Sequence, residues 1–301
     1  MTHPAFTFGT TELPGIWVGK FEASGTTDNY TIKPNEKSLT NINLTTMFSL
    51  SRSLTLEKSS IYGLNKNDID THMIKNMEWG AVAYLTNSIY GRYNDASTCI
   101  ASGCEVWINN INTGYGSNTV IDGQPQWGPS ITGCAGSSTG GGISSSQAAC
   151  ISGYDWTSKG VNASTTGNQY GVYDMAGGAW EYVMGVQKDS SGNVQVSGSG
   201  FNIPNIPDVK YYDIYDYQAE NEVGYTRYHL GDATKEVLKN TSSQGSNAWW
   251  SDYSYNIYSL YPWIGRGGGY TYGSFAGIFY FDKTDAGAHS HTSFRSVLTE
   301  P

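Results

Sequence analysis

The chain has 301 residues, of which 38% are hydrophobic and only 14% are charged, and its net charge is −9 at pH 7. Its 37 glycines, 23 tyrosines and 9 tryptophans, set against so little charge, exclude an intrinsically disordered chain and a coiled coil. The acidic balance without any basic cluster excludes a nucleic-acid-binding surface, and no apolar run approaches the ~20 residues of a membrane span.

The N-terminal third of the chain predicts one strand and two helices. Residues 13–22 are typical of an entering strand, and residues 44–54 predict a first helix. A stronger second helix is predicted to begin at Asp68 or Asp70 and to end at Gly91. Its apolar side chains recur at helical spacing: Ile69, Met73, Met77, Ala81, Tyr84 and Leu85.

Residues 92–167 predict a long surface insertion, because glycine, serine and threonine dominate the segment. All four cysteines lie in it: Cys99, Cys104, Cys134 and Cys150. The sequence has no CxxC pair of the kind that binds zinc. Four cysteines, an even number, in a loop-rich segment favour two disulfides over four free thiols in a cytosolic protein. Three pairings are open, and the short local loops favour Cys99–Cys104 and Cys134–Cys150. Two disulfides indicate an extracytoplasmic compartment.

The second half of the chain predicts short strands. They are expected at residues 169–173, 178–184 and 193–198, and residues 262–298 alternate glycines with short aromatic strands. Two early helices followed by short strands indicate an α+β fold, with residues 5–301 forming one domain elaborated by long loops.

Reactive motifs are missing from the sequence. No nucleotide-binding signature occurs in it. His289 and His291 form an H-S-H pair, which a strand would place on one face, where the two imidazoles could bind a metal. No third ligand stands at a matching spacing, so two exposed polar residues are the favoured interpretation. Neither a metal nor a cofactor is predicted.

Three segments together resemble the formylglycine-generating enzyme family, which has the sulfatase-modifying-factor fold. Residues 77–84 (MEWGAVAY) resemble its E-W-E-x-A-type helix, and residues 170–182 (YGVYDMAGGAWEY) resemble its G-L-x-D-M-x-G-N-x-W-E-W signature. Residues 266–295, which begin RGGGY and end SFR, resemble its C-terminal R-G-G-S-W … G-F-R block. The order and spacing match over nearly the whole chain. The resemblance implies a C-type lectin-like fold with sparse regular structure and large insertions.

Five residues of these motifs are predicted to have structural roles: Trp79, Trp180, Glu181, Arg266 and Arg295. The two tryptophans are core-sized aromatics at buried spacing. Arg266 precedes three glycines, which permit close backbone packing, and Arg295 could donate hydrogen bonds to carbonyl groups there.

The chain departs from the catalytic members of that family. Their oxidation of a substrate cysteine depends on two cysteines in the C-terminal block, and residues 266–295 contain none. Gly178 stands where the family has an Asn that resembles a calcium ligand, which weakens the case for calcium although Glu181 remains. We therefore predict a protein that is not an enzyme. The alternative is an oxidase or an iron-dependent oxygenase of the same group, which would need a facial His/carboxylate set that the sequence does not display.

A second resemblance is to the variable proteins of diversity-generating retroelements, which use this lectin-like fold and end their C-terminal block in G/S-F-R. Selected positions of that block are randomised through adenine-rich codons, which yield Tyr, Asn, Asp, Ser, His and Gly. Residues 258–298 have this composition, which is also typical of rigid binding surfaces. The predicted ligand-binding residues are Tyr258, Tyr270, Tyr272, Phe275, Tyr280, Asp282, Asp285, His289 and His291.

The function expected from this resemblance is a non-enzymatic ligand-binding or adhesion domain with a diversified C-terminal surface. Its partner would be an unknown protein or another cell-surface ligand. The expected location is the cell surface or the extracellular space, with a phage virion as the alternative. Many such proteins carry an N-terminal anchor or pilin-like segment, so we expect such a segment to be missing from this sequence. A third interpretation is a purely structural decoration of a pilus or capsid, which would have no ligand.

Overall fold

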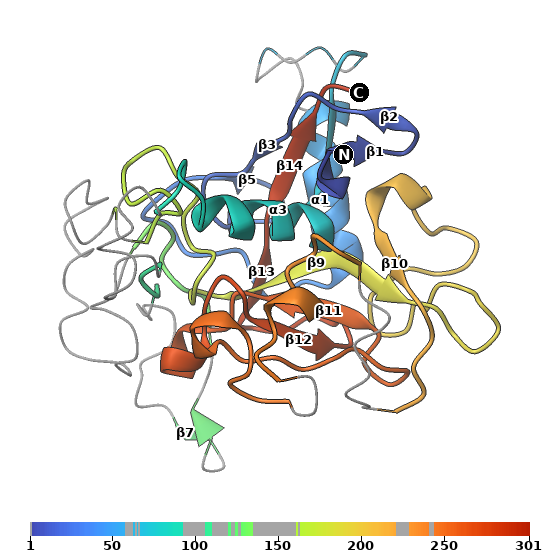
Figure 1. Cartoon of the computed structure of the whole chain (residues 1–301). Helices are drawn as coiled ribbons and strands as arrows, with labels where there is room; N and C mark the ends of the chain where they lie inside the picture. Colours follow the sequence, from blue (N-terminus) through green and yellow to red (C-terminus); the bar gives the residue numbers. More distant parts are fainter. Residues whose placement is uncertain are drawn as a thin grey trace.

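The computed structural model describes residues 2–57, 63, 65, 67–92, 106–109, 120–121, 124–125, 128–134, 161, 163–220, 229–240 and 244–301. Within these residues the regular structure consists of two α-helices, short 3₁₀ turns and several small sheets, as Figure 1 shows. The predicted α+β class, with two helices and short strands, is confirmed for this part of the chain. Most of the predicted insertion at 92–167 lies outside the described residues.

The α-helices are α1 (Leu44–Leu56) and α3 (Asn76–Thr86), and the 3₁₀ turns are Pro4–Phe6, Val209–Tyr211, Lys235–Val237, Trp249–Ser251 and Tyr270–Phe275. The largest sheet contains β9 (Trp180–Gln187), β10 (Asp213–Tyr215), β11 (Trp263–Arg266), β12 (Phe281–Thr284) and β13 (Thr292–Phe294). A three-stranded sheet contains β3 (Trp17–Val18), β14 (Ser296–Thr299) and β6 (Asp70–Met73). Three two-stranded sheets pair β1 (Thr7–Phe8) with β2 (Thr11–Glu12), β4 (Ser24–Gly25) with β5 (Tyr30–Thr31), and β7 (Val120–Ile121) with β8 (Gln124–Pro125).

Helix α1 begins at a side-chain cap. The side-chain oxygen of Asn43 (Oδ1) accepts hydrogen bonds from the Thr46 backbone N–H (3.0 Å) and the Thr46 hydroxyl (2.9 Å). This cap satisfies one of the free backbone amides of the first turn. Leu44 and Met47 are buried on its inner face. The predicted helix at 44–54 is therefore confirmed, and it extends two residues further.

The second predicted helix is wrong over its first part. Residues Asp70–Met73 form β6, which pairs antiparallel with β14, and all four of its residues are buried. Helix α3 begins only at Asn76, after Lys75, and it is followed by Asn87 rather than ending at Gly91. The pairing with a strand from the other end of the chain outweighs the helical spacing of the apolar residues.

Other predicted strands are shorter than expected or absent from the described residues. Of residues 13–22 only Trp17–Val18 are a strand, residues 169–173 are irregular, and in 193–198 only Val194 forms a bridge, to Lys188. Residues 178–184 are largely confirmed by β9, and the block 262–298 supplies β11 to β14.

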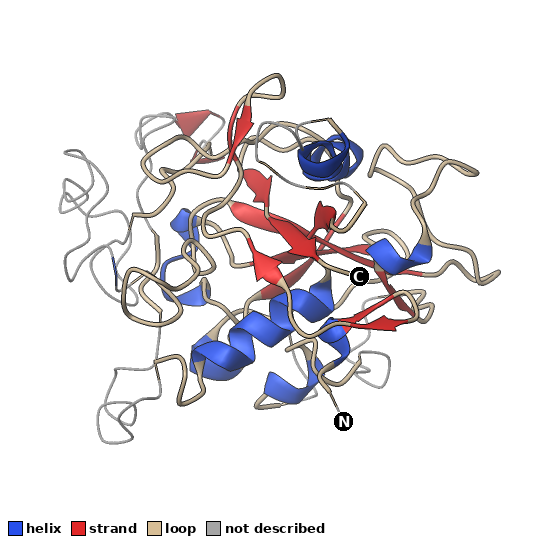
Figure 2. Ribbon diagram, turned by 90° about the horizontal axis from the view of Figure 1, so that it is seen from above, coloured by secondary structure: helices blue, strands red, loops and turns tan. Residues whose placement is uncertain are grey.

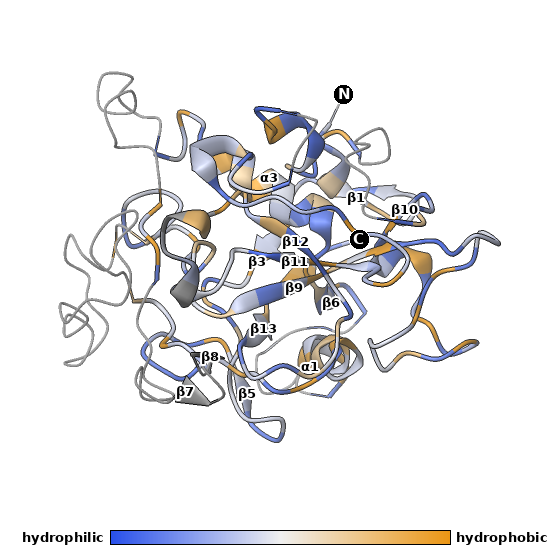
Figure 3. Ribbon diagram, turned by 90° about the horizontal axis from the view of Figure 1, so that it is seen from below, coloured by the Kyte–Doolittle hydropathy of each residue, from blue (hydrophilic) through white to orange (hydrophobic). Residues whose placement is uncertain are grey.

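Strand β9 is the centre of the largest sheet. It pairs antiparallel with β11 along its length, and on its other edge β13 and β10 run parallel to its first and last residues, respectively. The sheet lies between α3 and α1, as Figures 2 and 3 show. On the α3 side Val183 packs in one apolar cluster with Trp79, and on the α1 side Met184 packs in the other with Met47. The two largest apolar clusters therefore share one sheet.

Arg295 and Glu181 form a buried ion pair at the centre of the molecule. The Arg295 Nε and Nη2 atoms donate to the two Glu181 carboxylate oxygens at 3.1 and 2.5 Å, and neither side chain is exposed. The same guanidinium donates to the carbonyl oxygens of Gly19 (2.6 Å) and Tyr173 (2.8 Å). Arg295 thus joins the N-terminal segment, the middle of the chain and β9, which is the carbonyl bonding that its sequence position predicts.

Arg266 has a similar role at the end of β11. Its Nε donates to the Asn76 side-chain oxygen at 2.8 Å, and its Nη1 donates to the carbonyl oxygens of Ala233 (3.1 Å) and Tyr280 (3.3 Å). Trp79 is also fully buried and donates from Nε1 to the Ile278 carbonyl oxygen at 2.8 Å. The structural roles assigned to these residues agree with their burial and hydrogen bonds.

A further carboxyl group that the sequence did not reveal, that of Glu22, lies beside the ion pair of Arg295 and Glu181. Glu22 is fully buried and accepts a hydrogen bond from the Ala179 backbone N–H at 3.1 Å. Burial raises the pKa of Glu22 well above its ordinary value, and the neighbouring Asp174 and Glu181 add to the shift. Gly178 has φ +73°, and a Cβ there would meet Glu22 Oε1 at 2.3 Å. Glu22 therefore fills the space that a side chain at 178 would need.

We name Trp79, Glu181, Arg266 and Arg295 the buried framework.

Cys134, the cysteine within the described residues, is buried and disulfide-bonded. Cys99, Cys104 and Cys150 lie outside the described residues, so their pairing stays a prediction. No helix among the described residues has the length and apolar character needed to cross a membrane.

Candidate ligand-binding site

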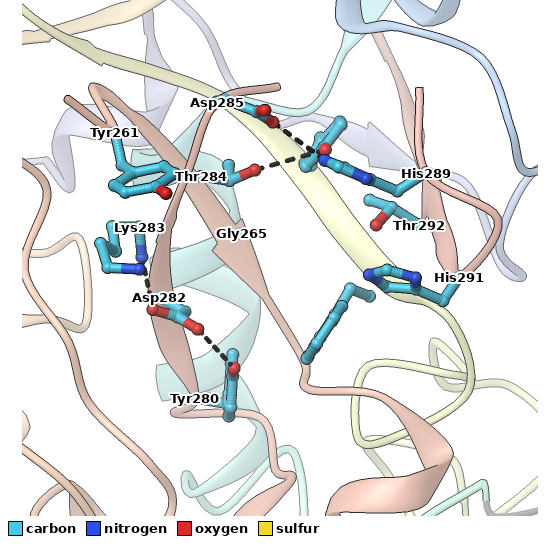
Figure 4. A pocket seen from close by; sticks show the side chains of 12 residues that line it. Tyr261, Gly265, Tyr280, Asp282, Lys283, Thr284, Asp285, His289, His291 and Thr292 are labelled. Atoms are coloured by element: carbon cyan, nitrogen blue, oxygen red, sulfur yellow. Dashed lines mark hydrogen bonds and ion pairs between the residues drawn. The ribbon is translucent and has the colours of Figure 1, made fainter. Parts of the chain in front are cut away.

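A pocket of about 310 Å³ opens beside the C-terminal strands, between β12 and the turn that leads into β13. Its walls combine aromatic rings with charged groups, as Figure 4 shows. The lining residues are Trp180, Tyr182, Tyr261, Gly265, Tyr280, Asp282, Lys283, Thr284, Asp285, His289, His291 and Thr292.

The register of the sheet creates this pocket. Gly265 on β11 pairs with Tyr182 on β9 and with Asp282 on β12, so it lies between the two walls. A Cβ on Gly265 would meet only the Asp282 carbonyl oxygen within 4 Å, at 3.9 Å. The missing side chain therefore leaves the space between β9 and β12 open.

Asp282 is the acidic group on the β12 side. Its carboxylate accepts hydrogen bonds from the Tyr280 hydroxyl (3.1 Å) and from the Lys283 backbone N–H (2.8 Å). Burial raises the pKa of Asp282 to about 6, although Lys283 and the Tyr280 hydroxyl oppose this shift. Among the ion pairs of the described residues none involves Asp282.

Lys283 directs its ammonium group to aromatic rings instead. Its Nζ lies 4.2 Å from the ring centroid of Tyr261 and 4.6 Å from that of Tyr255. At these distances the negative faces of the rings attract the cation. Two adjacent residues of β12 therefore have opposite charges that do not neutralise each other by direct contact.

The opposite wall carries the two histidines, whose rings stack with centroids 5.4 Å apart. His289 Nε2 lies 2.9 Å from the Asp285 carboxylate. Burial raises the pKa of Asp285, but hydrogen bonds from the Gly287 N–H and from His289 outweigh that effect, so its pKa is below the ordinary value. Burial, with His289 adding to the effect, lowers the pKa of His291 to about 4, so His291 is neutral at pH 7.

Aromatic contacts connect the two walls. The Trp180 ring meets the His291 ring edge to face at 4.5 Å and the Tyr272 ring at 5.0 Å. Tyr272 in turn meets Tyr280 at 5.9 Å. These distances are those of favourable aromatic pairs, which fix the walls relative to each other.

The structure brings five of the nine predicted ligand-binding residues into this pocket: Tyr280, Asp282, Asp285, His289 and His291. Tyr272 and Tyr258 border it through contacts with Trp180 and Tyr261, respectively. Phe275 is 47% exposed but does not line the pocket.

Tyr270 is wrongly placed by the prediction, because only 2% of it is exposed. Its backbone N–H donates to the Gly178 carbonyl oxygen at 2.8 Å, and its hydroxyl accepts from the Gly128 N–H at 2.9 Å. Tyr280 is also fully buried, and its hydroxyl points towards Asp282 at the pocket (Figure 4). A Cβ on Gly267, three residues before Tyr270, would lie 3.6 Å from the Trp79 ring, so the backbone passes close to the framework there.

Sequence reasoning missed part of the lining. Trp180 is predicted as a core aromatic, yet it is half-buried and lines the pocket together with Tyr182, while Glu181 between them points away from the pocket and pairs with Arg295. Strand alternation at 180–182 was the signal that could have separated these roles. Tyr261 and Lys283 were also missed.

His289 and His291 line the same wall of the pocket, as expected for two residues on one face. They are partly buried there, and so are not the two exposed polar residues that the sequence favours. Among the described residues no group of three or more His, Cys, Asp or Glu side chains is arranged to hold a metal ion.

No family model matches the chain, and a search of curated proteins finds no match either.

Proposed function

We propose that this protein is a non-enzymatic ligand-binding or adhesion domain that displays a variable surface from its C-terminal block, like the variable proteins of diversity-generating retroelements. One observation carries the proposal. Within residues 258–298 the side chains divide into two sets. Arg266 and Arg295 are buried and bind the backbone of distant segments, whereas Asp282, Asp285 and the two histidines meet in one pocket.

This division is what a diversified binding surface requires. Side chains that line a pocket can change while the backbone beneath them is held by groups that do not change. A backbone that is already ordered lowers the entropy lost on binding, so the side chains can contribute fully to affinity. Tyrosine, histidine and aspartate supply contact area and directional polar groups with few rotatable bonds.

We further propose a C-type lectin-like fold. Its support is the pairing of β3, near the N-terminus, with β14 near the C-terminus, and the sparse regular structure of the described residues between them. The central position of β9, which carries the W-E-Y part of the resemblance, adds to this support.

The proposed location is the cell surface or a phage virion. Its support is the disulfide bond of Cys134, because disulfides persist in oxidising compartments. A protein of the cytosol would keep that thiol reduced.

The flanking DNA of the gene tests the proposal. A retroelement variable protein should have a nearby reverse transcriptase gene and a near-identical template copy of the DNA that encodes residues 258–298. We expect the adenine differences between the two copies to fall on codons of pocket residues such as Asp282 and His291, and to spare Arg266 and Arg295. The absence of a template copy, or differences spread equally over framework codons, would contradict the proposal.

A further inference from the structure

We propose that the pocket beside β12 takes a primary ammonium group, of the kind that a lysine side chain of a protein partner presents. This inference rests on the proposed function and names the chemistry of its ligand. Three observations support it: a carboxylate that forms no ion pair among the described residues, aromatic walls around it, and an ammonium group that the same surface already holds.

The first observation is the electrostatic state of Asp282. Charged side chains are rarely buried without a partner of opposite charge. Asp282 is largely buried, and it accepts hydrogen bonds only from the neutral Tyr280 hydroxyl and the Lys283 backbone N–H among the described residues. No ion pair involves it within that part of the chain. A cation entering the pocket would supply the missing charge.

The second observation is that aromatic side chains line the pocket. Trp180, Tyr182 and Tyr261 line the same pocket as Asp282. Aromatic rings bind a cation through their negative faces and also shelter its alkyl chain from water. A pocket of about 310 Å³ is large enough for the side chain of lysine, and it lies at the small end of ligand pockets.

The third observation is Lys283. Its Nζ lies over the rings of Tyr255 and Tyr261, at 4.6 and 4.2 Å, so this surface already binds one ammonium group through tyrosines. Tyr261 belongs both to that pair and to the pocket lining. Lys283 therefore acts against an incoming cation by charge, and its removal should favour binding.

The other titratable groups of the pocket do not reverse this charge balance at pH 8. Asp285 is ionised and pairs with His289, and His291 is neutral. Among the residues that the structure describes, Lys283 is the positive group that acts on Asp282, and its other close neighbour, Tyr280, is uncharged. Two carboxylates therefore face one ammonium group, and a bound lysine would balance them.

The test uses the full chain and the probe Nα-acetyl-lysine methylamide, with binding followed by NMR of the tryptophan indole groups at pH 8. The norleucine analogue, which has the same chain without the ammonium, and the Nε-acetylated analogue are the neutral controls. We expect the lysine probe to bind at least about tenfold more tightly than either control, because a hydrogen bond to a charged group contributes about 1.5–3 kcal/mol. Equal binding of all three, or no binding of the lysine probe up to tens of millimolar, would overturn the inference.

Two variants with opposite expected effects separate a direct role from a loss of folding. Asp282→Asn should weaken binding of the lysine probe about tenfold or more, whereas Lys283→Met should strengthen it about two- to fivefold. Asp216→Asn, on an exposed carboxylate outside the pocket, is the matched control and should change nothing. If both pocket variants weaken binding alike, the proposed charge balance is wrong.

Binding should also fall as the pH drops, because Asp282 must be ionised to attract the ammonium. The affinity of the wild-type protein should decrease about tenfold per pH unit below about 6, and that of Asp282→Asn should fall much less steeply over this range. A pH profile shared by both proteins would contradict the assignment to Asp282.

Two further comparisons decide the source of the ammonium and keep this inference separate from the proposed function. A lysine-containing peptide that binds more tightly than free n-butylamine indicates a protein partner, and the reverse order indicates a small amine and overturns the lysine assignment. Gly265→Leu should fill the pocket and abolish binding of either probe. If template-directed variation is found in the gene but no ammonium probe binds, the ligand class is wrong and the proposed function stands.

Discussion

Arg295 and Asp282 belong to the same C-terminal block, but the molecule treats their charges in opposite ways. Arg295 is fully buried, forms a two-point ion pair with Glu181 and donates to two further carbonyl oxygens. Asp282 lies at a pocket and has no cation partner among the described residues. The charges of Arg295 and Glu181 in the framework are paired within the chain, whereas the Asp282 carboxylate at the pocket forms no ion pair among the described residues and can pair with a ligand.

This comparison assigns different physical tasks to neighbouring residues. A buried pair is strongly destabilised when one partner is removed, because the other charge is left without compensation. A carboxylate held at a binding site without a partner is itself destabilising until a ligand arrives. Substitutions in the two regions should therefore have effects of different size and even of different sign.

The largest effect is expected for Arg295→Met. The variant leaves Glu181 buried without its cation and frees the carbonyl groups of Gly19 and Tyr173, so we expect a loss of about 3–5 kcal/mol in the free energy of unfolding, or failure to fold. Urea denaturation followed by tryptophan fluorescence measures it. A midpoint within experimental error of the wild type would show that the framework does not depend on this pair.

Tyr270 and Tyr272 form a matched pair for the next largest effect. Tyr270→Ala removes a side chain that is 2% exposed, and we expect a loss of about 3–5 kcal/mol, as for other large aromatic truncations. Tyr272→Ala removes a half-buried ring at the pocket border, and we expect a loss of less than about 2 kcal/mol. Thermal melting of both variants checks the order, and a larger loss for Tyr272→Ala would contradict the burial that separates them.

Asp282→Asn should stabilise the protein at pH 8 while it weakens ligand binding. The pKa of Asp282 is raised to about 6 in the folded state, so the folded protein holds the proton more tightly than the unfolded chain, whose pKa is ~3.9. The corresponding stability is present below pH 4 and is lost as the pH rises to about 6. The variant has no carboxylate to ionise and therefore does not lose this stability. We expect its free energy of unfolding to exceed that of the wild type by up to about 3 kcal/mol at pH 8 and to differ little at pH 4.

The measurement is the melting temperature of both proteins between pH 4 and pH 8. Two curves that stay parallel over this range would show that the Asp282 carboxylate causes no loss of stability. A lower melting temperature of the variant at pH 8 would contradict the prediction more strongly.

The smallest effect is expected for Glu22→Gln. Burial raises the pKa of Glu22 well above its ordinary value, so the folded protein favours the protonated carboxyl, of which glutamine is the close analogue. The variant should melt within a few degrees of the wild type at pH 6 and should lose less stability as the pH rises. Glu181→Gln, at the carboxylate that pairs with Arg295, is the control and should be strongly destabilising. Equal losses for the two variants would show that Glu22 is ionised.

The parts of this fold that the sequence predicts are those in which local pattern and burial agree. The helix at α1 has a cap and one apolar face, and Arg266 and Arg295 flank a glycine-rich block in a chain with few charges. Strand β6 could not be predicted, because its partner β14 lies at the far end of the chain. Ile69 just before this strand and Met73 at its end also continue the helical spacing of α3.

The pocket was predicted in part for a related reason. The 281–284 segment is a strand, and Asp282 on it lines the pocket as predicted, but its neighbours Lys283 and Thr284 line the pocket too, which simple alternation does not predict. Residues Tyr270–Phe275 form a 3₁₀ turn, in which alternation does not hold, and the burial of Tyr270 could not be read from spacing. Trp180 is predicted to lie in the core because a large aromatic residue on a central strand is usually buried.

The most direct test of the division between framework and pocket is a pair of small libraries scored by resistance to protease. In one library Tyr272, Asp282, Asp285, His289 and His291 are randomised among Tyr, Asn, Asp, Ser and His, and in the other the framework residues Trp79, Glu181, Arg266 and Arg295 are randomised in the same way. We expect most members of the first library to fold and resist cleavage, and almost none of the second. Similar losses in both libraries would contradict the claim that this chain displays a changeable surface on a fixed framework.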